Sequence, residues 1–329
     1  MTWSTFDGSD DEWDRLIQSL GSSSPFSTSG WARFKSFGRW FPLRGILTDG
    51  ERTISAIQIL WFKLFGIVTI AWAPGGPTGT NGFSAKEFLR FVKNGTRSRF
   101  AYVRISSHDP IDKQTQESLH RLGWRASKYF VGARETFVVS RTNDKLADSS
   151  RLTSNWSRNL QRGLKRGAQI SIWPEPDINE LHLLHQQMTE YKGSKGPSQT
   201  PTPESLHQLI TSMKNDLVIV SARDESGVLI AVRAAFVVGD TAWDAFAASN
   251  ELARKNYASY ACAWKLLEEL DNRKVQRFDL AGIDFAENEG VFNFKKGIGG
   301  ERVKYLGEWD IASPTIFRHL AGIFISRMV

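Results

Sequence analysis

Cysteine is nearly absent from this 329-residue sequence, which contains only Cys262. No disulfide can form within the chain, and this cysteine usage fits a reducing cytosol. Because no basic partner for the thiol is apparent, we expect a buried structural side chain rather than a nucleophile. Residues 1–14 are acidic and polar, unlike a secretory signal peptide, so we expect a cytoplasmic protein.

Long hydrophobic runs are also missing. The most apolar stretch, residues 54–73, contains Gln58, Lys63 and Gly66 and is rich in Ile, Val, Thr and Trp. This composition favours two strands joined by a turn over a membrane-spanning helix. We therefore expect no integral membrane segment.

Several catalytic and cofactor motifs do not occur. The sequence has no Gly-x-Ser-x-Gly elbow and no Gly-x-x-x-x-Gly-Lys-Ser/Thr phosphate loop. Residues 297–300 lack the spacing of a dinucleotide fingerprint. His182 and His185 have neither a His-Glu-x-x-His pattern nor a third ligand placed by the sequence. We therefore expect neither a bound metal nor a resident cofactor.

The length exceeds what one compact core usually holds, so two domains are expected. Helices are expected at 10–20, 31–40, 84–93, 114–122, 151–166, 177–191, 204–213 and 257–272. Strands are expected at 44–48, within 53–73, and at 100–106, 128–140, 169–173, 217–223, 228–238, 241–248 and 277–281. The two halves share an order of helix, strands, helix and strand. This pattern predicts a mixed α/β (α+β) fold.

The most informative stretch lies near the C-terminal end. Phe278-Asp-Leu-Ala-Gly-Ile-Asp284 reads as a strand that enters a small-residue turn, and a polar loop follows. Phe294-Lys-Lys-Gly-Ile-Gly-Gly300 then reads as a glycine-flanked loop, and Tyr305-Leu-Gly-Glu308 belongs to a last short strand. Glycines let backbone N–H groups approach a ligand closely, and the lysines add positive charge. This combination suits a carbonyl that becomes an oxyanion, or a substrate that carries phosphates.

These segments resemble the closing signature of Fem-type (FemABX-like) transferases, the peptidoglycan interpeptide-bridge aminoacyltransferases and their relatives. Trp31-Ala-Arg-Phe-Lys35 is similar to the family's early Trp-x-x-x-Lys helix. Residues 73–77 and 156–167 resemble its Gly-Pro turn and the Arg-rich helix that opens its second domain. The chain has no long helical-hairpin arm, so it resembles the minimal members. Ser27 stands where many relatives carry Gln.

The resemblance implies two tandem GNAT-like domains, each with a mixed, mostly antiparallel sheet flanked by helices. Residues 1–148 together with 311–329 would form the acceptor domain, and residues 149–310 the acyl-donor domain. The implied reaction transfers an amino acid from aminoacyl-tRNA to an amine. The acceptor would be a peptide, a peptidoglycan precursor or a small natural product. Aminoacyl-tRNA would be a co-substrate, and we expect a monomer without a DNA partner.

Acyl transfer to an amine needs a neutral amine, an activated carbonyl and support for the oxyanion. The ester to the ribose is already activated, so no covalent nucleophile is required. We predict that Lys295 or Lys296 faces the oxyanion or the terminal phosphate and ribose; the alternative is that both are surface lysines. Asp279 or Asp284 is predicted to orient the amine or act as a base, with a loop cap as the alternative for Asp284.

Candidate binding residues occur in both halves. Trp31, Arg33 and Lys35 are predicted to clamp an anionic part of the acceptor, and a solvated helix face is the alternative. Phe294 is a candidate substrate-binding residue, and Trp243, Asp244 and Tyr260 are candidates for the second pocket; core packing is the alternative for Trp243.

The net charge of +7 serves solubility alone or favours an anionic partner. Residues 151–170 contain no acidic residue, whereas a solvated helix normally mixes both signs. We predict that these basic residues follow a tRNA backbone, with an ordinary cationic surface as the alternative. They are Arg151, Arg158, Arg162, Lys165 and Arg166.

Two other functions remain open. The first is an acyl-CoA-dependent GNAT N-acyltransferase, in which a glycine-containing loop before a helix holds the pyrophosphate. Residues 254–259, in the equivalent region, contain no glycine, which argues against CoA. The second is a non-catalytic module that associates with RNA or polysaccharide.

Overall fold

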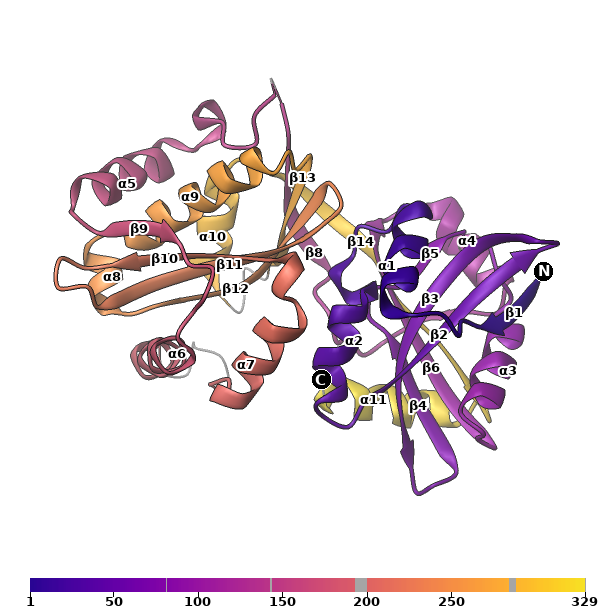
Figure 1. The fold of residues 1–329 in the computed structure, drawn as a ribbon. Helices are drawn as coiled ribbons and strands as arrows, with labels where there is room; N and C mark the ends of the chain where they lie inside the picture. Colours follow the sequence, from indigo (N-terminus) through magenta and orange to yellow (C-terminus); the bar gives the residue numbers. More distant parts are fainter. Residues whose placement is uncertain (81, 143, 193–199, 284–287, 329) are drawn as a thin grey trace. The chain divides into compact units, whose positions relative to one another are not determined.

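The computed structural model spans residues 1–329 and describes all of them except 81, 143, 193–199, 284–287 and 329 (Figure 1). Contacts between residues divide the chain into two compact units. Unit 1 comprises Met1–Arg134 and Lys304–Val329, and unit 2 comprises Glu135–Val303. The boundaries expected from the sequence, after residues 148 and 310, stay a prediction. The assignment of the acceptor to the first domain and of the acyl donor to the second stays a proposal.

Unit 1 contains a mostly antiparallel sheet. Its strands follow the order β1 (Thr2–Thr5), β2 (Phe41–Asp49), β3 (Arg52–Leu64), β4 (Val68–Ala73), β6 (Phe100–Pro110) and β14 (Glu301–Ser313), which belongs to this unit from residue 304 on. Two short strands, β5 (Pro77–Gly79) and β7 (Arg125–Ala126), pair with β3 and β14. Only the β4–β6 pair is parallel among the pairings described in this unit.

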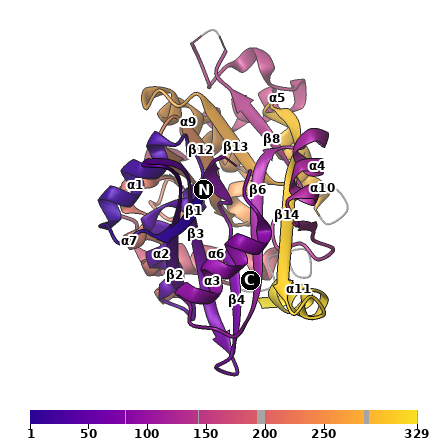
Figure 2. The ribbon, with the colours of Figure 1, turned by 90° about the vertical axis from the view of Figure 1, so that its right-hand side faces the viewer.

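Helices cover both faces of the unit 1 sheet (Figure 2). On β3, Ile57 and Ile59 belong to one apolar cluster, while Leu60 and Phe62 belong to another, because alternate side chains point to opposite faces. The first cluster includes residues of α3 (Ala85–Gly95) and α4 (Lys113–Arg121). The opposite face is covered by α1 (Asp10–Ser19), α2 (Ser29–Ser36) and α11 (Phe317–Met328). Both faces are therefore buried.

Unit 2 repeats this layered plan. The strands of its sheet follow the order β8 (Glu135–Ser140), β13 (Arg277–Gly282), β12 (Thr241–Ser249), β11 (Leu229–Val238), β10 (Leu217–Arg223) and β9 (Gln169–Ile172). Among the strand pairs described in this unit, only β12 and β13 run parallel. One face packs against α5 (Ser154–Lys165) and α9 (Ala258–Asn272), the other against α6 (Ile178–Lys192) and α7 (Pro203–Ser212) (Figure 1). Unit 2 has two further helices. In the chain, α8 (Glu251–Lys255) precedes α9, and α10 (Glu289–Gly297) follows β13. Three short 3-10 helices are η1 (Pro25–Ser27), η2 (Ser149–Arg151) and η4 (Lys214–Asp216).

The fold agrees with the predicted mixed α/β class, and several elements differ. The segment expected as a glycine-flanked loop forms α10, because Asn288 caps it by accepting a hydrogen bond from the Val291 N–H. The helix expected at 31–40 is α2, which starts earlier because Thr28 caps it, and β2 already begins at Phe41. The strand expected at 128–140 is confined to β8, the last short strand is the long β14, and β1 was not expected. In the three strands β1, β8 and β14, pairing with a neighbouring strand determines where the strand begins and ends, and the local sequence pattern does not show this pairing.

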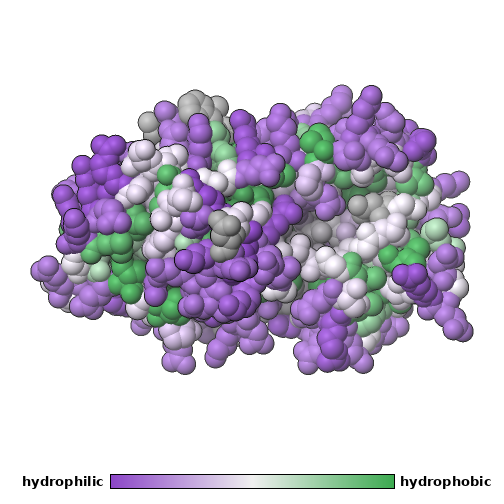
Figure 3. Space-filling model, turned by 90° about the horizontal axis from the view of Figure 1, so that it is seen from above, coloured by the Kyte–Doolittle hydropathy of each residue, from purple (hydrophilic) through white to green (hydrophobic). Residues whose placement is uncertain are grey.

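Two further expectations concern burial. Cys262 is buried in the unit 2 core, as expected, and burial raises the pKa of its thiol to about 12. Among the helices that the structure describes, none is both long and apolar enough to cross a bilayer. The face shown in Figure 3 is mostly hydrophilic, with hydrophobic residues in small separate patches.

Candidate functional site

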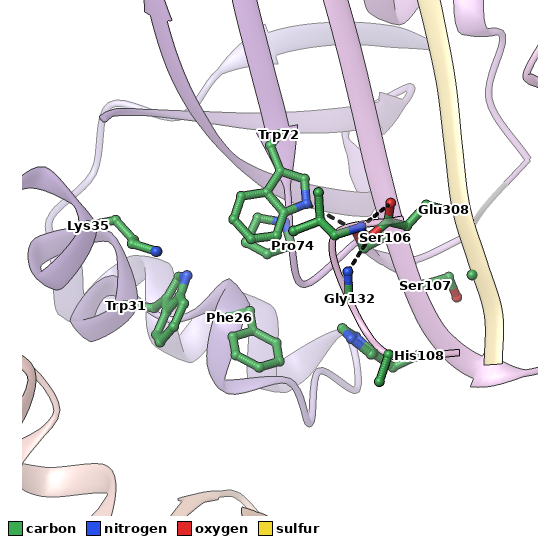
Figure 4. Close-up of a pocket in the computed structure, with 13 residues that line it drawn as sticks. Phe26, Trp31, Lys35, Trp72, Pro74, Ser106, Ser107, His108, Gly132 and Glu308 are labelled. Atoms are coloured by element: carbon green, nitrogen blue, oxygen red, sulfur yellow. Dashed lines mark hydrogen bonds between the residues drawn. The ribbon is translucent and has the colours of Figure 1, made fainter. Parts of the chain in front are cut away.

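Each unit contains a cavity that includes predicted site residues. The unit 1 cavity has a volume of about 260 Å³ and is lined from α2, β4, β6 and the middle of β14 (Figure 4). The unit 2 cavity has a volume of about 580 Å³ and is lined by α8, α9, α10, β11 and β12. The two cavities differ in chemistry.

Aromatic rings form one wall of the unit 1 cavity. The rings of Phe26 and Trp31 meet nearly at right angles with centroids 4.9 Å apart, and Trp72 Nε1 donates to Ser106 Oγ at 3.0 Å. Lys35 lies one helical turn after Trp31, and its Nζ is 5.4 Å from the Trp31 ring centroid. Figure 4 shows both side chains pointing from α2 toward the cavity. Burial lowers the pKa of Lys35, as expected for an ammonium group in a poorly solvated site.

The predicted clamp is only partly assembled. Trp31 and Lys35 line the unit 1 cavity together. Arg33 is exposed and forms an ion pair with Asp10 instead. It points elsewhere because alternate positions on a helix face different directions.

A buried carboxylate forms part of the cavity lining. Glu308 is 4% exposed and accepts hydrogen bonds from the Arg104 guanidinium at 3.0 Å and from the backbone N–H groups of Val131 at 3.1 Å and Gly132 at 2.8 Å. Burial raises the pKa of Glu308, while Arg104 acts in the opposite direction. These bonds hold the carboxylate in one orientation. Its role was missed, although two acidic residues, Glu308 and Asp310, among the apolar residues at 305–312 indicate buried, paired charges.

His108 is a second lining residue that the sequence did not single out. Its ring lies 5.5 Å from Phe26 and 5.1 Å from Tyr305. Burial lowers the pKa of His108 to about 4, although Asp109 opposes the shift. The imidazole is therefore neutral at pH 7. No sequence pattern would have identified it.

The unit 2 cavity gathers charged and aromatic groups from four elements. Tyr260 comes from α9, Phe294 and Lys295 from α10, Arg233 from β11 and Asp244 from β12. The rings of Tyr260 and Phe294 lie 5.1 Å apart, and the Arg233 guanidinium lies 5.1 Å from the Phe294 ring centroid. Arg233 was missed, although a lone arginine inside the apolar run 228–238 indicates a buried partner.

The two adjacent lysines have different environments. Lys295 has a side chain that is 9% exposed, and its Nζ donates to the Gly282 carbonyl at 3.0 Å and lies 3.7 Å from Asp244 Oδ2. Burial lowers the pKa of Lys295, while the charge of Asp244 opposes this shift. Lys296 is exposed. Of the two alternatives, the structure therefore places Lys295 in the cavity.

Asp244 has one carboxylate oxygen to spare. Its Oδ2 accepts a hydrogen bond from Arg233 Nη2 at 2.7 Å, and the two side chains are 10% and 8% exposed. Its Oδ1 is buried and has no hydrogen-bond partner within the described part of the chain. Buried carboxylate oxygens are normally satisfied, so this atom is available to a ligand in the cavity.

Other predicted residues of this half lie elsewhere. Asp279 is 1% exposed and accepts hydrogen bonds from Thr136 Oγ1 at 2.6 Å and from the Ala281 N–H at 2.9 Å, so it stabilises the irregular last part of β13. Trp243 is 7% exposed and does not line the cavity. Asp284 lies outside the described residues.

Four of the five basic residues predicted for tRNA lie exposed on or just after α5: Arg158, Arg162, Lys165 and Arg166. The guanidinium groups of Arg162 and Arg166 lie 5.4 and 5.3 Å from the ring centroid of Tyr257, which lines the unit 2 cavity. Arg162 also donates to the Tyr257 hydroxyl at 3.1 Å. This places part of the basic surface at the rim of that cavity.

Arg151 differs from the other four. It donates to the carbonyl oxygens of Ser140 at 2.6 Å and Lys145 at 2.8 Å, and its side chain is 16% exposed. Its guanidinium therefore holds the segment between β8 and α5 in place. Within the described residues, no group of three His, Cys, Asp or Glu side chains could hold a metal ion.

Comparisons with known proteins point to one family. Residues 176–321 match the FemAB family. The fold is similar to the crystal structure of FemX, with a TM-score of 0.81 and 14% identity over 97% of this chain and 100% of that chain. It is also similar to L-PGS from Bacillus licheniformis (TM-score 0.57, 14% identity, 97% and 96% coverage) and to a tandem GNAT protein from the clavulanic acid biosynthesis pathway (0.59, 10%, 94% and 98%). No curated protein matches the chain.

At these identities the solved structures establish the fold alone, and the match to the FemAB family covers less than half of the chain. The tandem GNAT-like fold and the resemblance to Fem-type transferases are confirmed. The chain is therefore similar to Fem-type proteins, and this similarity supports an acyltransferase or aminoacyltransferase.

Proposed function

We propose that this protein transfers an amino acid from aminoacyl-tRNA to an amine and so forms an amide bond. The observation that carries the proposal is the unit 2 cavity, where the Lys295 ammonium group and the spare oxygen of Asp244 lie beside a basic surface. A donor with a polyanionic body and a small cationic, activated acyl group fits this combination.

The donor would reach the cavity along the exposed basic residues of α5. Arg162 and Arg166 flank Tyr257, so phosphates of the tRNA acceptor end can be neutralised at the rim. Ser259 and Tyr260, at the start of the 15-residue α9, line the cavity. The positive end of the helix dipole favours an anion there.

Inside the cavity, two groups would act on the aminoacyl ester. The Asp244 Oδ1 atom suits the α-ammonium group of the carried amino acid. The Lys295 ammonium group suits the oxyanion that forms when the acceptor amine attacks the ester carbonyl. The intermediate then collapses, and the ribose hydroxyl leaves with the proton that the amine gives up.

The acceptor would occupy the unit 1 cavity. Lys35, held over the Trp31 ring, offers one cation to a phosphate or carboxylate of the acceptor. An acceptor that attacks through an α-amine, with a pKa of about 7.7–8.0, is partly neutral at pH 7. We propose a peptide, a peptidoglycan precursor or a small natural product, without a further cofactor, and a monomeric protein acting in the cytoplasm.

An acyl-CoA donor is the second candidate, because the fold is shared with GNAT proteins. The turn before α9 argues against it. Tyr257 occupies this turn with φ 55°, and its ring lies under two guanidinium groups. A loop that cradles a pyrophosphate uses glycines at this place so that the backbone can approach the phosphates.

The test is transfer of a labelled amino acid from a mixed aminoacyl-tRNA pool to candidate amines, with and without ribonuclease, next to labelled acetyl-CoA. We expect amide product that ribonuclease abolishes. Product from acetyl-CoA that is insensitive to ribonuclease would overturn the proposal. Asp244→Asn should raise the donor KM about 10- to 150-fold, since a charged hydrogen bond contributes roughly 1.5–3 kcal/mol. The matched control is Asp240→Asn, an exposed aspartate in the turn between β11 and β12.

A further inference from the structure

Unit 1 carries an exposed apolar surface at the end of the β3–β4 hairpin, where α11 lies beside it in both views (Figures 1 and 2). We call it the hairpin surface; its residues are Leu64, Phe65, Ile67, Ile316, Leu320 and Phe324. Phe65 is 88% exposed and Leu320 is 67% exposed, and a groove of about 330 Å³ runs between the hairpin and the helix. Contiguous exposed apolar surfaces of this kind mark interaction sites.

The helix presents apolar residues on two sides. Ala321 and Ile325 face inward and pack in the unit 1 core. Leu320 and Phe324 remain exposed along the other side, and Ile316, in the turn just before α11, continues the same spacing of four residues. Packing of α11 on its own unit therefore does not account for the second stripe.

The hairpin tip is also unusual. Phe65 and Gly66 have φ angles of 51° and 71°, the left-handed region that favours Gly, Asn or Asp in two-residue turns. A phenylalanine at this position is not explained by turn geometry. Its ring projects from a protruding hairpin, a shape suited to insertion into a soft phase rather than to a flat protein interface.

Cations surround the hairpin surface. Lys63 Nζ donates to the Arg97 carbonyl at 3.4 Å, and the Arg99 guanidinium lies over Phe100, whose ring contacts Phe317 of α11. Arg97, Arg99 and Lys63 are exposed, as is Arg327 at the end of α11. The sequence has no Asp or Glu in 52–86, 88–108 or 311–329. The side-chain charges that these segments contribute to the surface are therefore of one sign.

We propose that the hairpin surface attaches the protein peripherally to a bilayer that contains anionic phospholipid. The exposed rings and aliphatic side chains enter the boundary between headgroups and acyl chains, and the surrounding cations contact lipid phosphates. Charge complementarity favours this occupant, because the exposed side chains of Lys63, Arg97, Arg99 and Arg327 can contact lipid phosphates. The inference does not depend on the proposed aminoacyl transfer.

Sedimentation with vesicles tests this inference. Full-length protein is mixed with phosphatidylcholine vesicles, with or without phosphatidylglycerol, at salt concentrations of about 0.1 and 1 M. We expect binding to the anionic vesicles that weakens at high salt. Phe65→Ser with Leu320→Ser should reduce binding at least tenfold. Arg97→Gln with Arg99→Gln should reduce it about fivefold for each charge removed.

Matched controls replace residues that do not belong to the hairpin surface. Val228→Ser removes an exposed apolar side chain of unit 2, and Lys113→Gln removes an exposed cation. Both should bind vesicles like the unchanged protein, and circular dichroism melting should show that every variant folds. Absence of binding to anionic vesicles, or equal loss in the control variants, would overturn the proposal. It would also be overturned if light scattering showed a dimer that Phe65→Ser with Leu320→Ser converts to a monomer, since a second copy would then cover the surface.

Discussion

Replacement of Lys295 by methionine removes the ammonium group from the unit 2 cavity and keeps most of the length of the side chain. Removal of one oxyanion donor typically costs about 10²–10³ in kcat, or roughly 2.7–4 kcal/mol. We expect a loss of this size in kcat, with a smaller change in the donor KM, because the ammonium group acts mainly on charge that develops in the transition state. Asp244 keeps its 2.7 Å bond to Arg233 in the variant, so the cavity should stay folded.

Lys296→Met is the matched control. The two residues are neighbours on α10, yet Lys296 is exposed while the Lys295 side chain is 9% exposed. The control should retain kcat within about twofold, since a substitution at an exposed site away from such features usually has a small effect. Lys295→Arg, which keeps the charge, should recover part of the lost rate.

The pH dependence gives a second readout of the same group. In the proposed mechanism the protonated form of Lys295 supports the oxyanion, and burial lowers the pKa of Lys295. Activity should therefore fall as the pH rises through a value below the ordinary lysine pKa of about 10.4. Lys295→Met should lack this alkaline limb. Steady-state kinetics with aminoacyl-tRNA measures all three variants, and equal kcat values for Lys295→Met and Lys296→Met would refute the reasoning.

Three further predictions concern charge and packing. Burial lowers the pKa of His108 from 6.5 to about 4, so the unfolded chain takes up the proton first. The free energy of unfolding should then fall by roughly 2–3 kcal/mol as the pH drops across this interval, and urea titrations of His108→Gln should show a flatter pH dependence. Arg158→Glu with Arg162→Glu should weaken tRNA binding and reduce the slope of log K against log salt by about 0.7–0.9 per lost phosphate contact; an unchanged slope in filter binding would contradict a role in tRNA contact. Gly299→Ala should destabilise the protein by more than about 2 kcal/mol in urea unfolding, because its φ is 87° and the new Cβ would overlap a backbone carbonyl. Gly21→Ala, with a similar φ and open space around it, should cost only about 1–2 kcal/mol, and equal losses would contradict the packing argument.

The sequence predicts the fold class well because the evidence for it is local. Alternating apolar residues and turn glycines mark most strands, and the residues quoted from 278 to 308 carry the family resemblance. The error at α10 has a physical cause. Gly290 and Gly297 lie inside a helix and lower its apparent helix propensity, while the cap at Asn288 and packing of Gly297 against Trp156 stabilise it.

The candidate site was less predictable because it depends on tertiary contacts. Lys295 and Lys296 are indistinguishable in sequence, and only the direction of each side chain from α10 separates them. Arg233 and Asp244 come from paired strands, and their bond shows only when the register of β11 and β12 is known. His108 gains its low pKa from burial, which no local pattern encodes.

The central claim is that the unit 2 cavity binds the aminoacylated end of a tRNA. The most direct measurement is calorimetric binding of a short RNA that ends in a stable 3′-aminoacylamide, compared with the same RNA without the amino acid. The account predicts tighter binding of the aminoacylated RNA, with the difference lost in Asp244→Asn and retained in Lys35→Met. Equal binding of both RNAs, or a difference that Asp244→Asn leaves intact, would contradict it.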